Sequence, residues 1–246
     1  MRQFGLIGFP LGHSFSKKYF SEKFQNENID ARYDLYELSN ISEFPNLRNS
    51  IKLSGLNVTI PYKEQIIPLL DKLDDTAASI GAVNVIRFDY DNNGKATLTG
   101  FNTDAIGFEN SLKPFLKPHH KKALILGTGG ASKAILYTLQ QLGIECSYVS
   151  RSTREGQLTY SDLNEEILND NLLIVNATPL GTFPKTDACP DIPYQFLTDK
   201  HLLFDVVYNP AETLFMKKGR DAGATALNGE EMLIGQAIAA WEIWNR

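Results

Sequence analysis

One segment near the middle of the chain constrains the fold more than any other. Residues 122–126 form a short apolar run, residues 127–130 contain three glycines, and residues 132–142 have the pattern of a helix. Gly143 then ends that helix, and a second strand pattern covers residues 145–150. This order predicts a strand, a turn, a helix and a further strand, which together make a βαβ unit with parallel strands.

The glycine-rich turn has the form of a dinucleotide-binding loop. Gly127 permits a tight turn, Gly129 lets the backbone approach a pyrophosphate, and the N–H groups at the helix start attract the anion. Ser132 stands where the third glycine of this pattern usually falls, so helix and strand are expected to pack slightly further apart. The alternative, a turn without a ligand, is the weaker interpretation because the loop follows a buried strand and opens a helix.

The choice of cofactor is indicated at the end of the second strand, at Ser150, Arg151 and Ser152. An NAD enzyme places a carboxylate there to accept from the ribose 2′-hydroxyl. A guanidinium pairs instead with a 2′-phosphate, and Arg154 stands close enough in sequence to help. We therefore expect NADP, against the alternative that Arg151 is only an exposed loop residue.

Strand and helix patterns alternate over the whole chain, which predicts an α/β protein. One helix is expected to begin near Ser16, whose hydroxyl would cap it. The turn at residues 91–94 predicts a hairpin that closes the first sheet, and the proline-containing stretch 113–120 is typical of a connection between domains. Other strands are expected at residues 4–8, 32–38, 55–60, 83–88, 172–177, 202–207 and 225–227, and a last helix at 230–244.

Composition argues against several kinds of partner. The formal net charge of −5, without a dense Lys/Arg stripe, argues against nucleic acid or an anionic membrane as the main partner. Cys146 and Cys189 are far apart and have no nearby His pairs, so neither a disulfide framework nor a metal site is expected. Apolar stretches are too short to span a bilayer, and we expect a cytoplasmic protein that binds a small molecule.

Polar side chains also follow the expected strands of the amino-terminal half. They lie in four segments, at residues 8–16, 57–63, 81–84 and 100–104. Because ligands bind outside the carboxyl ends of strands in open α/β sheets, these segments are expected to converge on one site. Together with residues 176–181, 205–210 and 228–236, they resemble the shikimate dehydrogenase family over nearly the full chain.

The resemblance implies two α/β domains with a cleft between them. Residues 1–104 would form a substrate-binding and catalytic domain, and residues 105–229 a Rossmann-type NADP-binding domain. The last helix, within residues 230–246, would pack back on the first domain. The implied activity is the reversible reduction of 3-dehydroshikimate to shikimate with NADPH, on the route to chorismate and the aromatic amino acids.

The resemblance also assigns the catalytic pair. Lys63 would give and take the proton, paired with Asp104, while the nicotinamide carries hydride to or from the adjacent carbon. A positioned ammonium stabilises the charge that develops on the ketone oxygen and supplies its proton. For an arbitrary lysine a solvated surface position would be the better expectation, but Pro61 and the preceding strand hold Lys63 at a strand end.

The same resemblance assigns the residues that bind substrate and cofactor. Around the substrate, its carboxylate and ring hydroxyls would meet Ser14, Ser16, Thr59, Lys63, Asn84, Asp104, Tyr208 and Gln236. Around NADP the residues would be Gly127, Thr128, Gly129, Gly130, Ala131, Ser150, Arg151, Ser152, Thr178, Val206 and Gly229. His13 is interpreted as a residue that positions the backbone. The alternatives are a helix cap for Ser16, turn hydrogen bonds for Asn84 and Asn102, and a hydrogen bond within a helix packing surface for Gln236.

Three positions depart from the family pattern: Lys17 replaces a proline, Val85 a threonine and Ser150 an asparagine. The loss of a hydroxyl at Val85 is expected to weaken shikimate binding. Two other functions stay open, a quinate/shikimate dehydrogenase that prefers NAD and a shikimate-sensing module without catalysis. The sequence leaves monomer or homodimer undecided.

Overall fold

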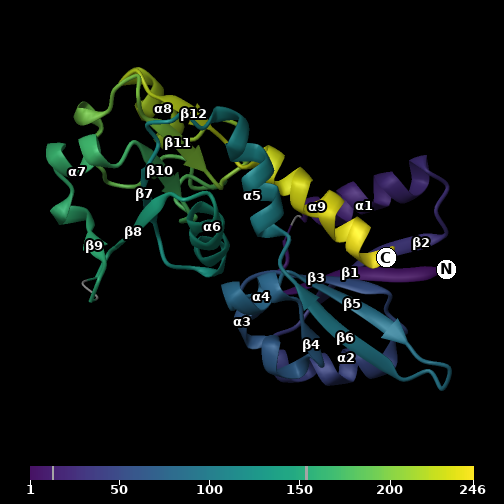
Figure 1. Cartoon of the computed structure of the whole chain (residues 1–246). Helices are drawn as coiled ribbons and strands as arrows, with labels where there is room; N and C mark the ends of the chain where they lie inside the picture. Colours follow the sequence, from purple (N-terminus) through teal and green to yellow (C-terminus); the bar gives the residue numbers. More distant parts are fainter. Residues whose placement is uncertain (13, 153–154) are drawn as a thin grey trace. The chain divides into compact units, whose positions relative to one another are not determined.

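The computed structural model describes residues 1–12, 14–152 and 155–246. His13 and Arg154, which the sequence suggested as a positioning residue and a cofactor contact, lie outside this description. The chain divides into two compact units, and each contains one six-stranded sheet (Figure 1). Unit 1 comprises Met1–Thr103 and Ala237–Arg246, and unit 2 comprises Asp104–Gln236. The predicted α/β class is confirmed.

The sheet of unit 1 has the strand order β2-β1-β3-β5-β6-β4. The first three strands are parallel, and an antiparallel hairpin of β5 and β6 joins them at β3. Its strands are β1 (Arg2–Gly8), β2 (Ala31–Glu37), β3 (Gly55–Val58), β4 (Lys72–Leu73), β5 (Val85–Tyr90) and β6 (Ala96–Phe101). Its helices include α1 (Phe15–Asn26), α2 (Phe44–Ser50), α3 (Tyr62–Gln65) and α4 (Asp75–Ile80), with short 3-10 turns at Ile41–Glu43 and Ile67–Leu69.

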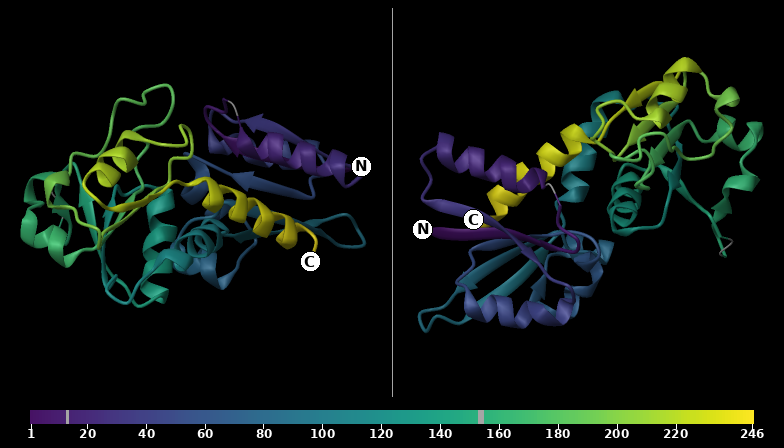
Figure 2. Two further views of the ribbon diagram at one scale, coloured as in Figure 1. Left: turned by 90° about the horizontal axis from the view of Figure 1, so that it is seen from above. Right: turned by 180° about the vertical axis from the view of Figure 1, so that it is seen from behind.

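Successive side chains along a strand point to opposite faces of the sheet, so the core of unit 1 is divided between the two faces. On one face Phe4 and Leu6 of β1 pack with α1 and with residues 237–244. On the other face Ile7 of β1 packs with α2, α3 and α4. Both views of Figure 2 show α1 and the C-terminal helix on the same side of this sheet. Unit 1 is therefore a three-layer structure with helices on both faces.

An aromatic cluster joins the chain's last helix to the first strand. The rings of Phe4 and Trp244 lie 4.8 Å apart, and the indole N–H of Trp244 donates to the Ile86 carbonyl over 3.0 Å. A Cβ at Gly55 would lie 2.3 Å from the Trp244 Nε1 atom, so only glycine fits beneath this ring. The end of the chain thus becomes part of the core of unit 1.

The sheet of unit 2 is entirely parallel, with the strand order β12-β11-β10-β7-β8-β9. Its strands are β7 (Lys122–Leu126), β8 (Glu145–Ser150), β9 (Leu158–Thr159), β10 (Leu173–Asn176), β11 (Leu202–Asp205) and β12 (Thr225–Leu227). Its helices are α5 (Asp104–Leu112), α6 (Gly130–Gln141), α7 (Glu165–Asp170), α8 (Leu214–Asp221) and the first part of α9 (Glu230–Trp244), with 3-10 turns at Lys113–Phe115, Tyr160–Asp162 and Tyr194–Phe196.

Helices cover both faces of this second sheet, as buried parallel strands require. Phe108 of α5, Ile135 of α6 and Met232 of α9 pack on one face, whereas Leu168 of α7 and Phe215 of α8 pack on the other. The backbones of α5 and α9 approach closely, since a Cβ at Gly107 would lie 2.3 Å from the Met232 carbonyl oxygen. Unit 2 is a doubly wound, Rossmann-type domain.

Several local predictions are confirmed and three are wrong. The βαβ unit at β7, α6 and β8 and the hairpin of β5 and β6 are present. The hairpin does not close the first sheet, because the two-residue strand β4 pairs with the outer side of β6. Ser14, not Ser16, caps α1, and its hydroxyl accepts from the Lys17 N–H.

The third error concerns the stretch 113–120, which lies inside unit 2 rather than between units. The ring nitrogens of His119 and His120 each lie within hydrogen-bond distance of the Lys200 carbonyl, at 3.2 and 3.1 Å. These contacts, 81 and 80 positions apart in the sequence, hold the stretch to the segment just before β11. Prolines alone could not distinguish such a packed loop from a linker.

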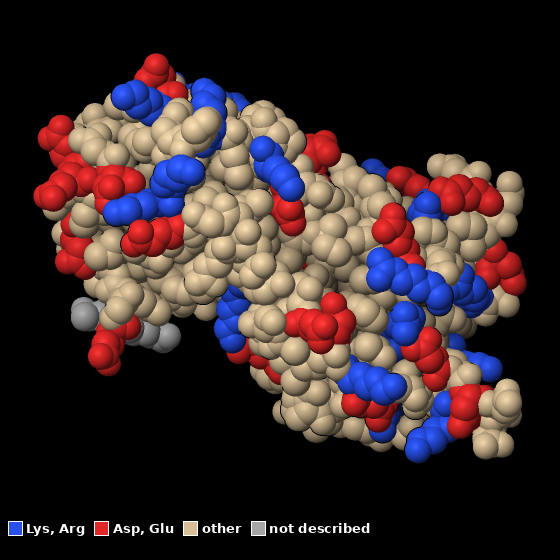
Figure 3. Space-filling view, in the orientation of Figure 1, with Lys and Arg blue, Asp and Glu red and all other residues tan. Residues whose placement is uncertain are grey.

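The visible surface mixes charges of both signs. On the face drawn in Figure 3, Lys and Arg side chains are interspersed with Asp and Glu side chains on both parts of the molecule. This distribution agrees with the formal net charge of −5. Within the described ranges, no helix is both long and apolar enough to cross a bilayer.

Candidate active site

Strand ends gather at one edge of the sheet in unit 1. The first strand ends at Gly8, β3 ends at Val58, and the antiparallel β5 begins beside them at Val85. The Val58 N–H donates to the Asn84 carbonyl over 2.8 Å, and the Asn84 N–H donates to the Phe101 carbonyl over 3.0 Å. The polar segments that the sequence singled out therefore meet at this edge, as predicted.

Thr59 and Lys63 follow the end of β3. The Thr59 N–H donates to the Ile7 carbonyl over 2.9 Å, which extends the pairing with β1 by one residue. Lys63 lies in the short helix α3 rather than on the strand itself, and its side chain is half-buried. Its carbonyl accepts from the Val83 N–H over 2.7 Å, so the backbone at Lys63 is tied to the segment that leads to Asn84.

Asn84 is buried and holds the chain just before the predicted catalytic carboxylate. Its side-chain Nδ2 donates to the Thr103 hydroxyl over 3.0 Å, and its side-chain Oδ1 accepts from the Thr103 N–H over 2.7 Å. Asn102 donates to the Ala82 carbonyl over 2.9 Å. Both asparagine side chains therefore hydrogen-bond backbone groups. Asp104 follows Thr103 directly, begins α5 and is buried.

The two serines of the predicted carboxylate clamp lie at the start of α1. Ser14 is the N-cap of this helix. Ser16 makes a hydrogen bond with the Tyr33 hydroxyl, which opposes the rise that burial causes in the pKa of Tyr33. The Tyr33 hydroxyl in turn donates to the Asn57 side chain over 2.7 Å. These contacts fix where the two serines stand, and both side chains are half-buried.

The glycine-rich loop in unit 2 has the geometry of an anion site. Gly127 has φ +102°, and a Cβ there would lie 2.9 Å from the Thr178 Cγ2 atom. Gly129 is the N-cap of α6, which begins at Gly130, and the space beside its Cα is open. The first N–H groups of a helix have no partner within it, so they are available to an anion. Ser132 is buried and donates to the Gly129 carbonyl over 2.6 Å, which explains how a serine replaces the third glycine.

The three residues at the end of β8 differ in exposure. Ser150 is buried and its hydroxyl donates to the Ser152 carbonyl, whereas Arg151 and Ser152 are exposed. Burial raises the pKa of the nearby Tyr160, and the Arg151 guanidinium opposes that rise. An exposed guanidinium therefore stands where an NAD-binding domain would place a carboxylate.

The ends of β10 and β11 carry a polar network whose function the sequence analysis did not assign. The Asn176 amide donates to one carboxylate oxygen of Asp205 over 2.9 Å. The side-chain oxygen Oδ1 of Asn176 accepts from the Thr178 N–H and hydroxyl over 3.0 and 2.6 Å. The sequence held a signal for this network. Asn176 and Asp205 are polar residues at the ends of buried strands, the same pattern that identified the candidate site residues of the amino-terminal half.

Val206 and Gly229, which the sequence placed near the nicotinamide, are in contact with each other. A Cβ at Gly229 would lie 2.2 Å from the Val206 carbonyl oxygen, so only glycine permits this approach. Tyr208, two residues after Val206, is exposed. Gln236 is buried in α9 and donates to the Leu233 carbonyl of the same helix over 3.1 Å.

Comparison with known proteins agrees with this arrangement. Residues 6–86 match the family model described as the shikimate dehydrogenase substrate binding domain. The NADP-dependent shikimate dehydrogenase of Methanosphaera stadtmanae is 35% identical, over 98% of this chain and 90% of its own. The chain belongs to the shikimate dehydrogenase family.

Solved structures of shikimate dehydrogenase relatives share the fold. The crystal structure of the Aquifex aeolicus shikimate dehydrogenase superposes with a TM-score of 0.86 at 36% identity, covering 99% of this chain and 92% of its own. A quinate dehydrogenase from Corynebacterium glutamicum, in complex with NAD, also superposes with a TM-score of 0.86, at 26% identity, over 99% and 93% of the two chains. Fold similarity therefore does not separate shikimate from quinate, or NADP from NAD.

The departure from the family pattern at Val85 has a structural explanation. Val85 is fully buried in the apolar cluster that contains Phe4 and Trp244. A valine at this position packs against apolar side chains, whereas a hydroxyl would need a polar partner there. The change therefore concerns core packing more directly than the substrate. Lys17 is exposed in the first turn of α1.

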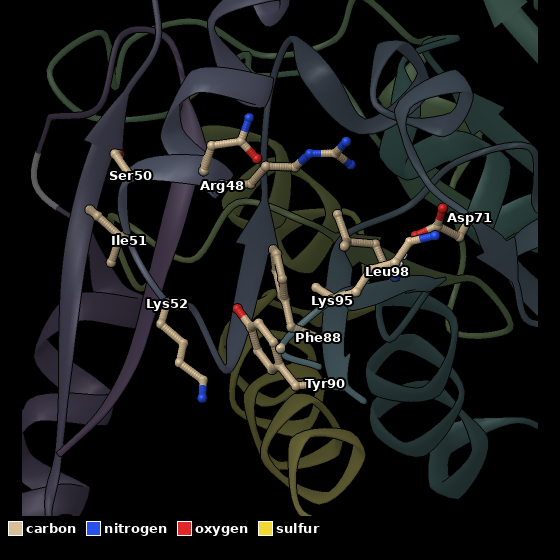
Figure 4. Close-up of a pocket in the computed structure, with 12 residues that line it drawn as sticks. Arg48, Ser50, Ile51, Lys52, Asp71, Phe88, Tyr90, Lys95 and Leu98 are labelled. Carbon is tan, nitrogen blue, oxygen red and sulfur yellow. Dashed lines mark hydrogen bonds between the residues drawn. The ribbon is translucent and has the colours of Figure 1, made fainter. Parts of the chain in front are cut away.

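A separate hollow in unit 1 does not involve the family's predicted site residues. This cavity of about 560 Å³ lies between the end of α2 and the β5–β6 hairpin (Figure 4). Arg48, Lys52, Phe88, Tyr90 and Lys95 are among its lining residues, and Lys52 lies over the Tyr90 ring at 4.9 Å. The described part of the chain holds no group of three or more His, Cys, Asp or Glu side chains suited to a metal ion.

Proposed function

We propose that this chain catalyses the reversible reduction of 3-dehydroshikimate to shikimate with NADPH. The observation that carries the proposal is the glycine loop at the carboxyl end of β7, in a parallel sheet, within a chain that resembles NADP-dependent shikimate dehydrogenases over nearly its full length. Unit 2 would be the NADP-binding domain, and unit 1 would bind the substrate. The reaction belongs to the synthesis of chorismate and the aromatic amino acids.

The residues of unit 2 fit NADP. Residues 127–131 would hold the pyrophosphate, because an anion at a helix N-terminus meets free N–H groups and the positive end of the helix dipole. The exposed Arg151 would pair with the 2′-phosphate, helped by Ser150 and Ser152. Thr178, Val206 and Gly229 would surround the nicotinamide riboside. When bound, NADPH supplies the hydride.

Lys63 would act as the general acid in the direction of reduction. As hydride reaches the ring carbon, negative charge develops on the former ketone oxygen, and the Lys63 ammonium stabilises that charge and donates its proton. In the reverse direction the neutral amine takes the proton back from the hydroxyl. Asp104 would orient the ammonium and favour its charged form.

The remaining site residues would bind the substrate without taking part in proton transfer. Ser14 and Ser16, with Thr59 and Tyr208, would donate to its carboxylate. Asn84, Asp104 and Gln236, with Lys63, would hydrogen-bond its ring hydroxyls. Neutral hydroxyl donors suit this task because they bind a carboxylate and leave Lys63 as the group that transfers the proton.

A steady-state assay with purified protein tests the proposal. The rate of formation of the reduced cofactor, NADPH or NADH, is measured with shikimate and with quinate, each with NADP and with NAD. We expect the highest kcat/KM with shikimate and NADP. Equal or better turnover with quinate and NAD would instead identify a quinate/shikimate dehydrogenase, and shikimate binding without turnover at any pH would identify a sensing module.

The proposal includes the cellular location, the partners and the oligomeric state of the enzyme. We expect it to work in the cytoplasm on a small molecule, without nucleic acid or membrane as a partner. Sedimentation at assay concentration will distinguish a monomer from a homodimer.

A further inference from the structure

The carboxylate of Asp205 joins three separate segments of unit 2. One of its oxygens accepts from the Asn176 amide at the end of β10 over 2.9 Å and from the Val207 N–H over 3.0 Å. The other oxygen accepts from the hydroxyl of Thr213, the N-cap of α8, over 2.6 Å. Asp205, Asn176 and Thr213 are all buried. Figure 1 shows β10, β11 and α8 side by side in this unit.

The network continues from Asn176 to the dinucleotide loop. The side-chain oxygen Oδ1 of Asn176 accepts from both the N–H and the hydroxyl of Thr178. The Thr178 methyl group in turn lies beside Gly127, where an added Cβ would approach it within 2.9 Å. One side of the Asp205 carboxylate therefore fixes Thr178 against the first glycine of the loop.

The network also reaches the second strand end. Because Asp205 accepts from the Val207 N–H, it shapes the turn that contains Val206. The Val207 carbonyl then accepts from the Gly229 N–H over 3.1 Å, and Gly229 packs directly on Val206. Thr178, Val206 and Gly229, the three residues predicted around the nicotinamide riboside, are thus all connected to one carboxylate.

We propose that Asp205 is a positioning residue that holds the nicotinamide end of the cofactor site in place. It does so by tying the ends of β10 and β11 together, and it touches neither the cofactor nor the substrate. The inference rests on the proposed function, because Thr178, Val206 and Gly229 are assigned to the nicotinamide by that proposal. The adenine end of the cofactor, near Arg151, lies outside this network.

The chemistry of the network predicts different effects for asparagine and alanine at position 205. Burial raises the pKa of Asp205 and its bonds with Thr213, Val207 and Asn176 oppose the rise, which leaves the pKa at about 6, so the group is mostly ionised at neutral pH. An amide keeps one oxygen for Asn176 and Val207, and its NH₂ group would face the Thr213 hydroxyl. An alanine leaves the Asn176 amide and the Val207 N–H without their acceptor.

The experiment compares Asp205→Ala with Asp205→Asn, using two probes. The first probe is NADP, and the second is adenosine 2′,5′-bisphosphate, which lacks the nicotinamide riboside. Thr213→Val is the matched control, because it removes a donor from the same carboxylate and leaves the link between β10 and β11 intact. Dissociation constants are measured by calorimetry, and thermal unfolding is followed for every variant.

We expect Asp205→Ala to weaken NADP binding about tenfold and to leave adenosine 2′,5′-bisphosphate binding within about twofold of wild type. Asp205→Asn and Thr213→Val should both stay within about threefold of wild type for NADP. A purely structural role would lower the unfolding temperature and weaken both probes alike, and this result would overturn the inference. Unchanged NADP binding in folded Asp205→Ala would overturn it as well.

A second variant covers the case in which Asp205→Ala does not fold. Asn176→Ala breaks the same link from β10 and leaves the bonds of Asp205 with Val207 and Thr213. The same selective loss of NADP binding is expected, and equal loss of both probes would again contradict the inference. If the wild-type protein itself bound no NADP, the proposed function would fail. The effect of the variants on NADP binding, measured against a wild type that binds NADP, tests the role of Asp205.

Discussion

Replacing Gly129 by alanine separates cofactor binding from folding. Gly129 has φ −81° and ψ −178°, values that any residue adopts, and no described atom lies within 4 Å of an added Cβ. The cost to the fold is limited to the poorer N-cap propensity of alanine, about 0.5–1 kcal/mol. The unfolding temperature should therefore fall by only about 1–4 °C.

The effect on NADP should be much larger. The new methyl group would lie where the backbone approaches the pyrophosphate, and it would push the phosphates away from the N–H groups at the start of α6. A hydrogen bond to a charged group contributes about 1.5–3 kcal/mol. Loss of one such bond corresponds to about 10- to 150-fold weaker binding.

Gly143→Ala provides the matched control in the same unit. Gly143 ends α6 with φ +72° and also has open space beside its Cα. Alanine in this left-handed conformation costs about 1–2 kcal/mol, more than the change at Gly129, yet it should leave the NADP dissociation constant unchanged. Calorimetric titration and thermal unfolding of both variants compare the two effects directly. If Gly129→Ala bound NADP as tightly as wild type, residues 127–131 could not be the pyrophosphate site.

Three further predictions follow from the other residues. Lys63→Ala should lower kcat by about 10²- to 10⁴-fold with little change in the shikimate dissociation constant, measured by fluorescence titration; a higher KM alone would contradict a role in proton transfer. Arg151→Ala should weaken NADP by about tenfold or more and NAD hardly at all, and an unchanged ratio of their KM values would argue against the 2′-phosphate contact. The free energy of unfolding should fall as the pH drops below about 6.5, because burial lowers the pKa of His120 and His201 and each Nδ1 accepts a backbone N–H that protonation would oppose. Urea unfolding of wild type and of the His120→Asn, His201→Asn double variant over a range of pH checks this. Asp205 contributes in the opposite direction in both proteins, because its raised pKa favours the folded state as the pH falls through about 6, and the difference between the two proteins cancels that contribution. If the free energy of unfolding changed with pH by the same slope in both proteins, the prediction would be refuted.

Local chemistry made a large part of this protein predictable. The glycines at residues 127–130 predicted a tight turn, and Gly127 does have a positive φ. The strand before the turn and the helix after it were predictable because their hydrophobic residues repeat with different periods. Residues 91–94 likewise predicted the hairpin of β5 and β6. The polar residues at strand ends predicted which segments of unit 1 would meet at one edge, because parallel strands end together.

Other features depend on partners that are distant in the sequence. Two serines near the start of α1 both suit an N-cap, and the backbone path selects Ser14 while Ser16 turns to Tyr33. The strand β4 is only two residues long and exists because β6 offers an edge to pair with. The local sequence predicts neither the cap at Ser14 nor the strand β4, because the deciding contacts, of Ser16 with Tyr33 and of β4 with β6, are made with a residue or strand that is distant in the sequence.

Residue patterns were enough to predict the α/β class, the glycine loop and the residue types of the candidate site. The packed fold was needed to show that Asn176 and Thr213, 37 positions apart, both hydrogen-bond the buried carboxylate of Asp205. A polar side chain has many possible hydrogen-bond partners along the sequence. Once the side chain is buried, its partners are the groups that the packed strands bring within about 3 Å. That selection is made by the fold as a whole.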